Sequence, residues 1–421
     1  LGPPGFSSGR LNPGGPSYVS TEESLQCTPV GFSRTRAEST IMDGTESIVS
    51  GCDPRDTDTL TTLRLSMLPG LGPRTLAALL DAFGSPAAVL AASESDLASV
   101  AGVGQKMIHT LRTASHHVDA ESILHWCQEH DCDLIRKDAS DYPTSMLDLP
   151  DAPPILFSRG QILPHDQLAV SIVGTRHGTA YGTRQAERIA YGLAKAGVTI
   201  VSGMARGIDA AAHEGALSAG GRTIAVLGGG LGQIYPAEHV GLADAIAADG
   251  GVISEYRPDA KPRGGMFPQR NRILAALGLA TLVIEAPDRS GALITARQAG
   301  ELGREVLALP GAVTSRASRG TNQLIREGAT LVQTVDDVLE ALGPMAHSVA
   351  TDDGHEVRNP AELKLNELER AVLDRIEPTP TLVDADIDSS GLPSHQVMAT
   401  LSVLEKRRMI RRKRGQNVSR V

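Results

Sequence analysis

Short apolar runs recur along the middle of the chain at intervals of about 25 to 30 residues, and segments with helical spacing separate them. Runs that are apolar throughout, such as SIV or TLVIEA, are typical of strands whose sheet is covered by helices on both faces. An interval of this length fits one strand and one crossover helix. We therefore predict an α/β domain over residues 131–342, with a Rossmann-like, doubly wound, mostly parallel sheet that follows a connector containing a short strand at residues 155–157. The predicted strands start near Leu168, Val198, Arg222, Gly251, Thr281, Glu305 and Thr330.

Helical spacing also fills residues 56–130, where one phrase occurs twice. LPGLGPRTLAALLDAF contains Gly70 and VAGVGQKMIHTL contains Gly102, and both read apolar-Gly-apolar-Gly at the start of a helix. The phrase resembles the helix-hairpin-helix, in which paired glycines let backbone N–H groups approach a phosphate. Glycines that only form tight turns in a helical hairpin explain the repeat equally well. Either interpretation predicts a small helical domain.

The two ends of the chain differ from these domains. Residues 1–55 are rich in Gly, Pro, Ser and Thr and show little periodicity, which predicts disorder. Residues 343–362 combine helix breakers with charges and predict a linker. Residues 363–421 contain two segments with helical spacing and a basic tail, an arrangement that resembles a winged helix-turn-helix.

The net charge of -9 conceals an uneven distribution. Between Glu405 and Val421 there are eight basic residues and one acidic residue, so this end carries +7 and the remainder -16. Phosphate binding requires local positive charge rather than a positive total. The overall charge therefore does not exclude a nucleic-acid partner.

Four cysteines, no signal-peptide pattern and no apolar run of transmembrane length predict a cytoplasmic protein without disulfides or membrane contact. The segment HWCQEHDC contains His125, Cys127, His130 and Cys132. No second cysteine pair completes a tetrahedral set, and the spacing suits a buried helix face. We predict no metal site.

Glycine, small hydroxyl residues and arginine follow the ends of the first predicted parallel strands, in GTRHGTAYG and SGMARGID. Ligands of open α/β sheets bind at the carboxyl ends of strands, where helix starts also present backbone N–H groups to anions. The planar guanidinium of arginine suits phosphate oxygens. The predicted phosphate-binding residues of these two loops are Gly174, Thr175, Arg176, Ser202, Gly203, Arg206 and Gly207.

A third segment, KPRGGMFPQRNR, carries four positive charges, no acid and one aromatic residue, Phe267. Basic groups beside an aromatic ring suit single-stranded nucleic acid, because phosphates take the charge and an unstacked base takes the ring. We favour stacking of a base on Phe267 over a role of this ring as a hydrophobic staple. For Asn271, a structural role as a helix cap or a partner of a loop carbonyl explains the residue as well as contact with nucleic acid does. Two later helix starts also suit anions. These segments add Lys261, Arg263, Phe267, Arg270, Asn271, Arg272, Gly291, Thr295, Gly320, Thr321 and Asn322 to the predicted contacts.

No catalytic set accompanies these loops. The first is not GxGxxG, and the second strand ends in Ser202 and Gly203 rather than an acid that could hold a ribose, which disfavours NAD. Glu255 and Glu285 end strands without a paired carboxylate, a Cys/His dyad or a Walker lysine. His213, among alanines, is interpreted as a packed core histidine. The sequence favours a binding protein without a cofactor over an enzyme.

Taken in order, GTR, SGMARGID, FPQRNRI, SGALITA, LPG and GTNQLI are similar to the motifs of the DprA/Smf family, the DNA-processing proteins of bacterial transformation. The resemblance covers residues 60–421. It implies a non-enzymatic recombination mediator whose Rossmann-like domain binds single-stranded DNA and forms a homodimer, and which loads RecA recombinase. It also implies a SAM-like N-terminal domain and a C-terminal winged helix.

The resemblance implies a DNA site formed by Arg176, Phe267, Arg270 and Arg272. The chain departs from the family in RGGM, where many members have a basic residue closer to the aromatic one. Either Lys261 or Arg263 must then supply that charge, and the sequence does not decide between them.

Two other functions stay open. The LPG and GTN phrases are also similar to Rossmann-type phosphoribohydrolases, but those enzymes have a glutamate shortly after the Gly-Thr pair, where this chain has Asn322, Gln323 and Leu324. Alternatively, the winged helix binds duplex DNA through a wing with Lys413 and Arg414, although a solvated basic tail explains these charges equally well.

Overall fold

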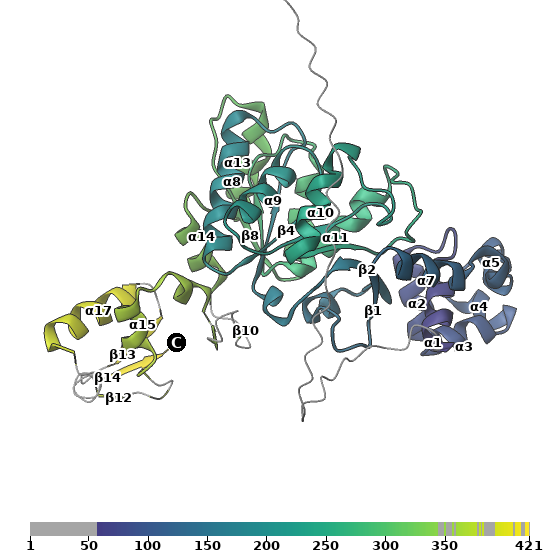
Figure 1. Ribbon diagram of the computed structural model, residues 1–421, viewed down its shortest axis with the longest axis horizontal. Coiled ribbons are helices and arrows are strands. Elements are labelled where there is room, and N and C mark those ends of the chain that lie inside the picture. The colour runs from purple at the N-terminus through teal and green to yellow at the C-terminus, as the bar shows by residue number, and fades with distance from the viewer. Residues whose placement is uncertain are drawn as a thin grey trace, which may run out of the picture. The chain divides into compact units, whose positions relative to one another are not determined.

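The computed structural model describes the helical domain, the sheet domain and most of the C-terminal domain (Figure 1). The described residues are 57–343, 349–350, 356–357, 359–376, 379, 381–382, 392–406, 409–413 and 417–420. The disorder predicted for residues 1–55 lies outside them, and so does Arg414 of the predicted wing. Within the predicted linker, Val349 is buried and pairs with Val357 in a short antiparallel sheet of β10 (Val349–Ala350) and β11 (Glu356–Val357).

The N-terminal domain is helical, as predicted. Gly70 and Gly102 have φ of 81° and 86°, a left-handed conformation that favours glycine. A Cβ at Gly70 would lie 3.7 Å from Met107, and one at Gly102 would lie 3.4 Å from Thr75, so each turn faces a helix of the other repeat. The glycines therefore serve as tight turns that pack the two hairpins together. The helices are α1 (Thr57–Ser66), α2 (Pro73–Phe83), α3 (Pro86–Ala91), α4 (Glu94–Ser99), α5 (Gln105–Arg112), α6 (Ala114–His117) and α7 (Ala120–Glu129).

The central sheet has the order β1-β2-β6-β5-β4-β3-β7-β8-β9, and β3 to β9 pair in parallel. This confirms the predicted sheet and the strand starts. The connector contributes more than the one short strand expected, because β1 and β2 add an antiparallel edge beside β6. The strands are β1 (Cys132–Arg136), β2 (Ile155–Gly160), β3 (Ala169–Val173), β4 (Thr199–Ser202), β5 (Thr223–Val226), β6 (Gly251–Ser254), β7 (Ala280–Val283), β8 (Glu305–Ala308) and β9 (Thr330–Leu331).

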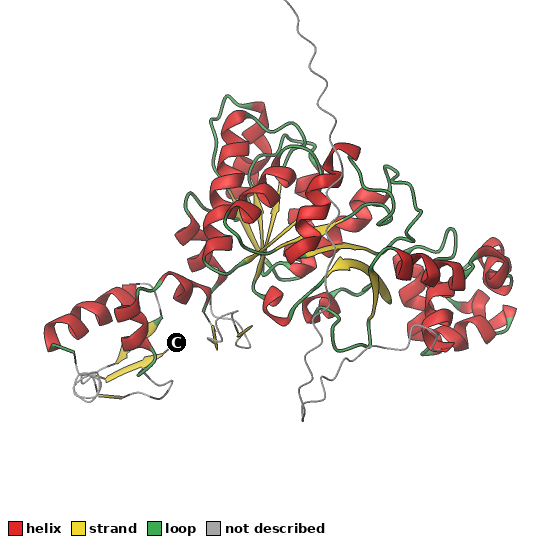
Figure 2. Ribbon diagram, in the orientation of Figure 1, coloured by secondary structure: helices red, strands yellow, loops and turns green. Residues whose placement is uncertain are grey.

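Helices cover both faces of this sheet (Figure 2). The core on one face joins the strands to α8, α9 and α14, and the core on the other joins them to α11 and α12. Because β3 pairs with both β4 and β7, the strand order reverses at β3, which is the topological switch point of a doubly wound fold. The helices are α8 (Ala180–Lys195), α9 (Ile208–Ser218), α10 (Val240–Asp249), α11 (Met266–Leu277), α12 (Gly291–Glu301), α13 (Arg319–Arg326) and α14 (Val335–Leu342).

The C-terminal domain has its own apolar core, which includes Val372, Leu401 and Val418. Its sheet has the order β12-β14-β13, and together with the helices that the structure describes in this domain it forms the predicted winged helix. Two basic residues of this end are paired: Arg412 with Glu405 at 3.1 Å, and Arg420 with Glu362 at 2.7 Å. The elements are α15 (Glu367–Leu373), β12 (Thr381–Leu382), α17 (Ser394–Lys406), β13 (Ile410–Lys413) and β14 (Asn417–Arg420).

The cysteine- and histidine-containing segment does not form one buried helix face as predicted, because His125 and His130 are exposed and Cys132 lies on β1 rather than on α7. Cys127 and Cys132 are buried, and burial raises the pKa of their thiols to about 12 and about 11. The ring of His130 stacks on that of Trp126 at 4.1 Å. Among the described residues, no group of three or more candidate ligands is placed to hold a metal ion. None of the described helices is long and apolar enough to cross a membrane.

His213 is a core residue on α9, in line with its interpretation from sequence. Its side chain is fully buried, and Nδ1 lies 2.7 Å from Thr223 Oγ1, whose hydroxyl donates to the carbonyl oxygen of Ile200. Nε2 has no hydrogen-bond partner. Burial lowers the pKa of His213 from 6.5 to about 3, so the folded protein holds a neutral imidazole.

We expect His213 to make the fold sensitive to acid. Below pH 6.5 the unfolded chain binds a proton at this residue, whereas the folded chain does not until about pH 3, so the free energy of unfolding falls across that window. Between about pH 7.5 and about pH 5 the loss is about 2 kcal/mol. Urea unfolding at both pH values measures it. His213→Gln removes the titrating group, so an equal pH dependence in this variant would contradict the assignment.

Candidate nucleic-acid interface

Loops from three neighbouring strands meet the start of α11 at the carboxyl edge of the sheet. Arg176 follows β3, and its guanidinium carbon lies 4.7 Å from the centroid of the Phe267 ring, a cation–π contact. Tyr235, in the loop after β5, places its ring centroid 5.9 Å from that of Phe267 at an interplanar angle of 50°. Arg176 is exposed, Phe267 is half-buried and Tyr235 is 45% exposed. This surface therefore offers two aromatic rings and an accessible cation.

Glycine backbone forms the floor between these side chains, in a shallow hollow that we call the Phe267 pocket. Gly203, Gly228 and Gly229 line it together with Arg176, Tyr235, Pro262 and Phe267. A Cβ at Gly228 would lie 2.7 Å from the Phe267 ring, so the ring occupies space that only glycine leaves. Polar backbone can thus approach a ligand closely in this pocket.

The loop that carries Arg176 is held by β7. Thr175 N donates to the carbonyl oxygen of Glu285 at 2.7 Å, and the Glu285 carboxylate accepts from Thr179 N at 2.9 Å and Thr179 Oγ1 at 2.7 Å. A Cβ at Gly174 would lie 2.6 Å from Ile208, and one at Gly207 would lie 2.6 Å from the carbonyl oxygen of Thr175. Gly174, Thr175 and Gly207 therefore shape the loop from which Arg176 projects.

Arg270 lies beneath the loop after β4 and is only 3% exposed. Its Nη1 donates to the carbonyl oxygen of Val226 at 2.9 Å, and a Cβ at Gly203 would run into its guanidinium. Burial lowers the pKa of Arg270 to about 10 and raises that of Asp209, while the opposite charge of each favours the ionised form of the other. Arg270 was predicted to contact phosphate directly. Its burial corrects that expectation, because the guanidinium supports the loop from below.

Arg272 and Ser202 are also used inside the protein. Arg272 is 7% exposed; its Nη2 lies 2.6 Å from Glu255 Oε2, and its Nε lies 3.2 Å from Asp151 Oδ1. The buried Ser202 hydroxyl donates to the carbonyl oxygen of Ile172 at 2.6 Å. Direct contact of either side chain with DNA, as predicted from sequence, does not fit this burial.

The predicted contacts at the two later helix starts mostly hold backbone. Asn271 Nδ2 and Thr295 Oγ1 both donate to the carbonyl oxygen of Gly291, at 3.3 Å and 3.5 Å, and Thr295 is 1% exposed. Asn322 bonds both the N–H and the carbonyl oxygen of Gly311. Gly291 is exposed at the start of α12. The buried Gly320 and Thr321 bond main-chain carbonyls, with Gly320 N donating to Ala286 and Thr321 Oγ1 to Ser318.

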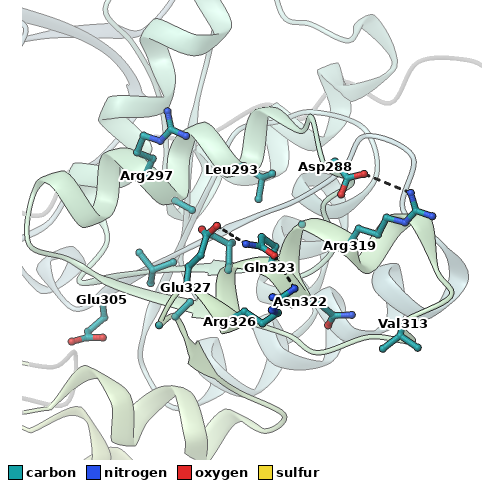
Figure 3. Close-up of a pocket in the computed structure, with 16 residues that line it drawn as sticks. Asp288, Leu293, Arg297, Glu305, Val313, Arg319, Asn322, Gln323, Arg326 and Glu327 are labelled. Atoms are coloured by element: carbon teal, nitrogen blue, oxygen red, sulfur yellow. Dashed lines mark hydrogen bonds and ion pairs between the residues drawn. The ribbon is translucent and has the colours of Figure 1, made fainter.

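A larger hollow of about 1000 Å³ lies beside α12, α13 and β8, on the other half of the sheet (Figure 3). Its charges are of both signs and partly paired, since Arg319 Nη1 lies 3.7 Å from Asp288 Oδ2 and Gln323 Nε2 donates to Glu327 at 2.7 Å. Such mixed charge does not favour a polyanion. The Phe267 pocket is the better candidate for nucleic acid.

Comparisons with known proteins identify the family of the chain. The family model of DNA recombination-mediator protein A matches residues 133–343, half of the chain. The chain belongs to the DprA/Smf family. Two further models match its flanking domains: the SAM-like helix-hairpin-helix tandem at residues 62–114 and the DprA winged helix domain at residues 356–416. The DprA/Smf resemblance and the three-part fold expected from the sequence are thereby confirmed.

Relatives in the DprA/Smf family cover much of the chain. Protein Smf of Synechocystis is 39% identical over 67% of this chain and 72% of its own length, and the putative DprA of Mycobacterium tuberculosis is 45% identical over 56% and 60%. The X-ray structure of DprA from Streptococcus pneumoniae covers 67% of this chain and 96% of that chain, with 35% identity and a TM-score of 0.58. These proteins are similar to this one across the sheet domain that carries the Phe267 pocket.

Two residues of this DprA/Smf chain were missed from sequence. Tyr235 lies in the glycine-rich loop GGGLGQIYP after β5, which contributed no residue to the predicted contacts. Glu238, in the short helical turn η3 (Ala237–His239), pairs with the exposed Arg206, and both side chains are about half exposed. An aromatic residue at the end of a glycine-rich loop was the signal that could have identified Tyr235.

Proposed function

We propose that this member of the DprA/Smf family binds single-stranded DNA at the Phe267 pocket and acts as a recombination mediator that loads RecA, without catalysing a reaction. The observation that carries the proposal is the accessible Arg176 guanidinium over the Phe267 ring, with Tyr235 beside it. Single-strand binding proteins combine cations for phosphates with aromatic rings for unstacked bases, and duplex DNA does not offer its bases to such rings.

The carboxylates near this edge support a binding role rather than catalysis. Glu285 accepts two hydrogen bonds from Thr179, and Asp209 lies 6% exposed beside Arg270. A phosphoribohydrolase would need an acid after the Gly-Thr pair, where Asn322 instead bonds Gly311. These acids are committed to holding loops, so none is available to transfer protons to a substrate.

The side chains that we propose to contact DNA are fewer than the sequence suggested. They are the exposed or half-exposed Arg176, Arg206, Tyr235, Phe267 and one of the two loop cations Lys261 and Arg263. Glycines of the loops supply backbone N–H groups. The buried residues described above form the layer beneath and position this surface.

We propose a homodimer formed through the sheet domain, as the family resemblance implies. Strand β9 supports this proposal, because it is the last strand at one edge of the sheet among the described residues, and a strand edge offers backbone groups to a second copy. Leu331 on β9 is 47% exposed, which adds apolar area to that edge. RecA loading rests on the family membership alone.

Phe267→Ala tests the proposed function. Loss of one stacked base costs about 1–3 kcal/mol, so binding to a labelled oligothymidylate should weaken roughly 5- to 100-fold, whereas Phe267→Trp should retain it. Fluorescence anisotropy at fixed salt measures the affinity. Tyr191→Ala removes an exposed aromatic ring on α8, away from the pocket, and serves as the control. Wild-type affinity in Phe267→Ala would refute the site.

A further inference from the structure

Two hollows flank the start of α11. One is the Phe267 pocket, and the other is a cleft of about 410 Å³ between the first hairpin turn of the helical domain and the sheet domain, which we call the hairpin cleft. Residues of one short segment line them in turn: Pro262 and Phe267 face the pocket, whereas Arg263 and Met266 face the cleft. The segment before α11 therefore forms the ridge between the two hollows.

The ridge is low because its crest is Gly264 and Gly265. Both are exposed, and a Cβ at either would have no heavy atom within 4 Å. Gly265 also precedes α11 without a side-chain cap, and Pro268 in the first turn has no N–H. The crest thus has free space and the positive end of a twelve-residue helix, which together suit a phosphate between two nucleotides.

The hairpin cleft has the lining and the volume expected of a site that binds a nucleobase. Leu71 and Pro73 of the hairpin turn form an apolar wall opposite Met266, and the cleft volume lies within the range of small-molecule sites, about 300–1,000 Å³. At its rim Arg263 is exposed and makes no ion pair with any residue that the structure describes. The carboxylates that also line the cleft, Asp151 and Glu255, are paired with Arg272. A slot with an apolar wall and an unpaired cation at its mouth complements a base attached to a phosphate.

The walls of the cleft are held together by a shared core. Leu68 and Leu76 of the helical domain belong to the same buried cluster as Phe157 and Leu227 of the sheet domain. In addition, Trp126 lies 3.0 Å from the position that a Cβ would take at Gly232, in the loop that carries Tyr235. The cleft is therefore a preformed feature of the fold.

We propose that the bound DNA strand crosses the Gly264–Gly265 ridge and places a second base in the hairpin cleft, so that the helical domain forms part of the single-strand site. The proposal rests on the proposed function, because the strand must first occupy the Phe267 pocket. It also chooses between the two loop cations: Arg263 lines the cleft, whereas Lys261 lines neither hollow.

The length dependence of binding tests this path in the full chain. Oligothymidylates from about three to about 12 nucleotides are titrated by anisotropy, and the affinity gained with length is compared between variants. Leu71→Glu puts a carboxylate in the cleft, with Leu90→Glu as the control for a carboxylate at a half-buried position elsewhere in the helical domain. Arg263→Ala is matched by Lys195→Ala at the opposite sheet edge.

We expect Leu71→Glu and Arg263→Ala each to reduce binding of the longer strands about tenfold and to change binding of the shortest strand little, whereas the controls match the wild type. If the affinity of both variants rises with strand length as much as that of the wild type, there is no second base site in the cleft. If Phe267→Ala also binds every length like the wild type, the proposed function itself fails. If only Phe267→Ala loses binding, the proposed function stands and only the second base site in the hairpin cleft is rejected.

Cross-linking of the unaltered chain gives an answer that does not depend on a variant's folding. Oligothymidylates with 5-iodouracil at single positions are irradiated in complex with the protein, and the linked peptides are identified by mass spectrometry. The path predicts one position linked near Phe267 or Tyr235 and a neighbouring position linked to the hairpin turn near Met67 and Leu71. Links confined to the Phe267 pocket at every position would overturn the proposal.

Discussion

Replacing Arg176 with alanine is expected to weaken binding of single-stranded DNA roughly 10- to 150-fold. A hydrogen bond from a charged group to a phosphate contributes about 1.5–3 kcal/mol, which corresponds to this loss. Arg176 is placed to make such a bond, because its side chain is exposed and its guanidinium lies 4.7 Å from the centroid of the Phe267 ring. Anisotropy titration of a labelled oligothymidylate at several salt concentrations measures the loss.

The salt dependence separates a phosphate contact from a general effect of charge. Loss of one phosphate contact reduces the slope of log affinity against log salt by about 0.7 for a single strand. Lys195→Ala removes the same charge from the last turn of α8, at the opposite edge of the sheet, and should leave the slope unchanged. An Arg176→Ala variant with the affinity and slope of the wild type would show that this arginine does not hold the strand.

Arg270→Ala is expected to lower the free energy of unfolding by about 3–5 kcal/mol, because it leaves the buried carbonyl oxygen of Val226 without its donor and a nearby buried carboxylate without a compensating charge. That carboxylate is Asp209, which is 6% exposed and whose pKa burial already raises. Urea unfolding at neutral pH measures the loss. If Arg270 held DNA directly, as the sequence suggested, the variant would instead fold with wild-type stability and lose binding.

A double variant separates the lost charge balance from the lost volume. Arg270→Met combined with Asp209→Leu removes both buried charges and should recover most of the stability, since apolar replacements of a buried pair are often neutral or better. It also tests whether the pair merely positions the loop after β4. A double variant as unstable as Arg270→Ala would contradict the explanation by an unpaired carboxylate.

The sheet could be predicted from sequence because its strands are covered on both faces. Every residue of β3, β4 and β6 is buried, so each strand reads as a continuous apolar run and its start could be located within a residue or two. β1 was missed because CDLIR has no regular alternation of buried and exposed positions and contains two charged residues among five, and so resembles a connector.

The site was predicted less completely, because a charged side chain was assumed to be exposed. Arg270 and Arg272 of α11 are buried, where Arg270 donates to the carbonyl oxygen of Val226 and Arg272 pairs with Glu255, and both partners come from other parts of the chain. Phe267, three residues before Arg270, lies at the surface instead. Which side of a helix start faces solvent depends on such distant partners, and no local pattern reveals them. Tyr235 had a local signal, its place at the end of a glycine-rich loop, but its contact with Phe267 arises only in the folded protein.

The central claim is that the Phe267 pocket holds an unpaired DNA strand. Competition measures this most directly: a labelled oligothymidylate bound to the full chain is displaced either by an unlabelled single strand or by a duplex of equal length. The account predicts that displacement requires at least about tenfold more duplex, and that Phe267→Ala and Arg176→Ala remove most of this preference. Equal displacement by both competitors, unchanged in the two variants, would contradict it.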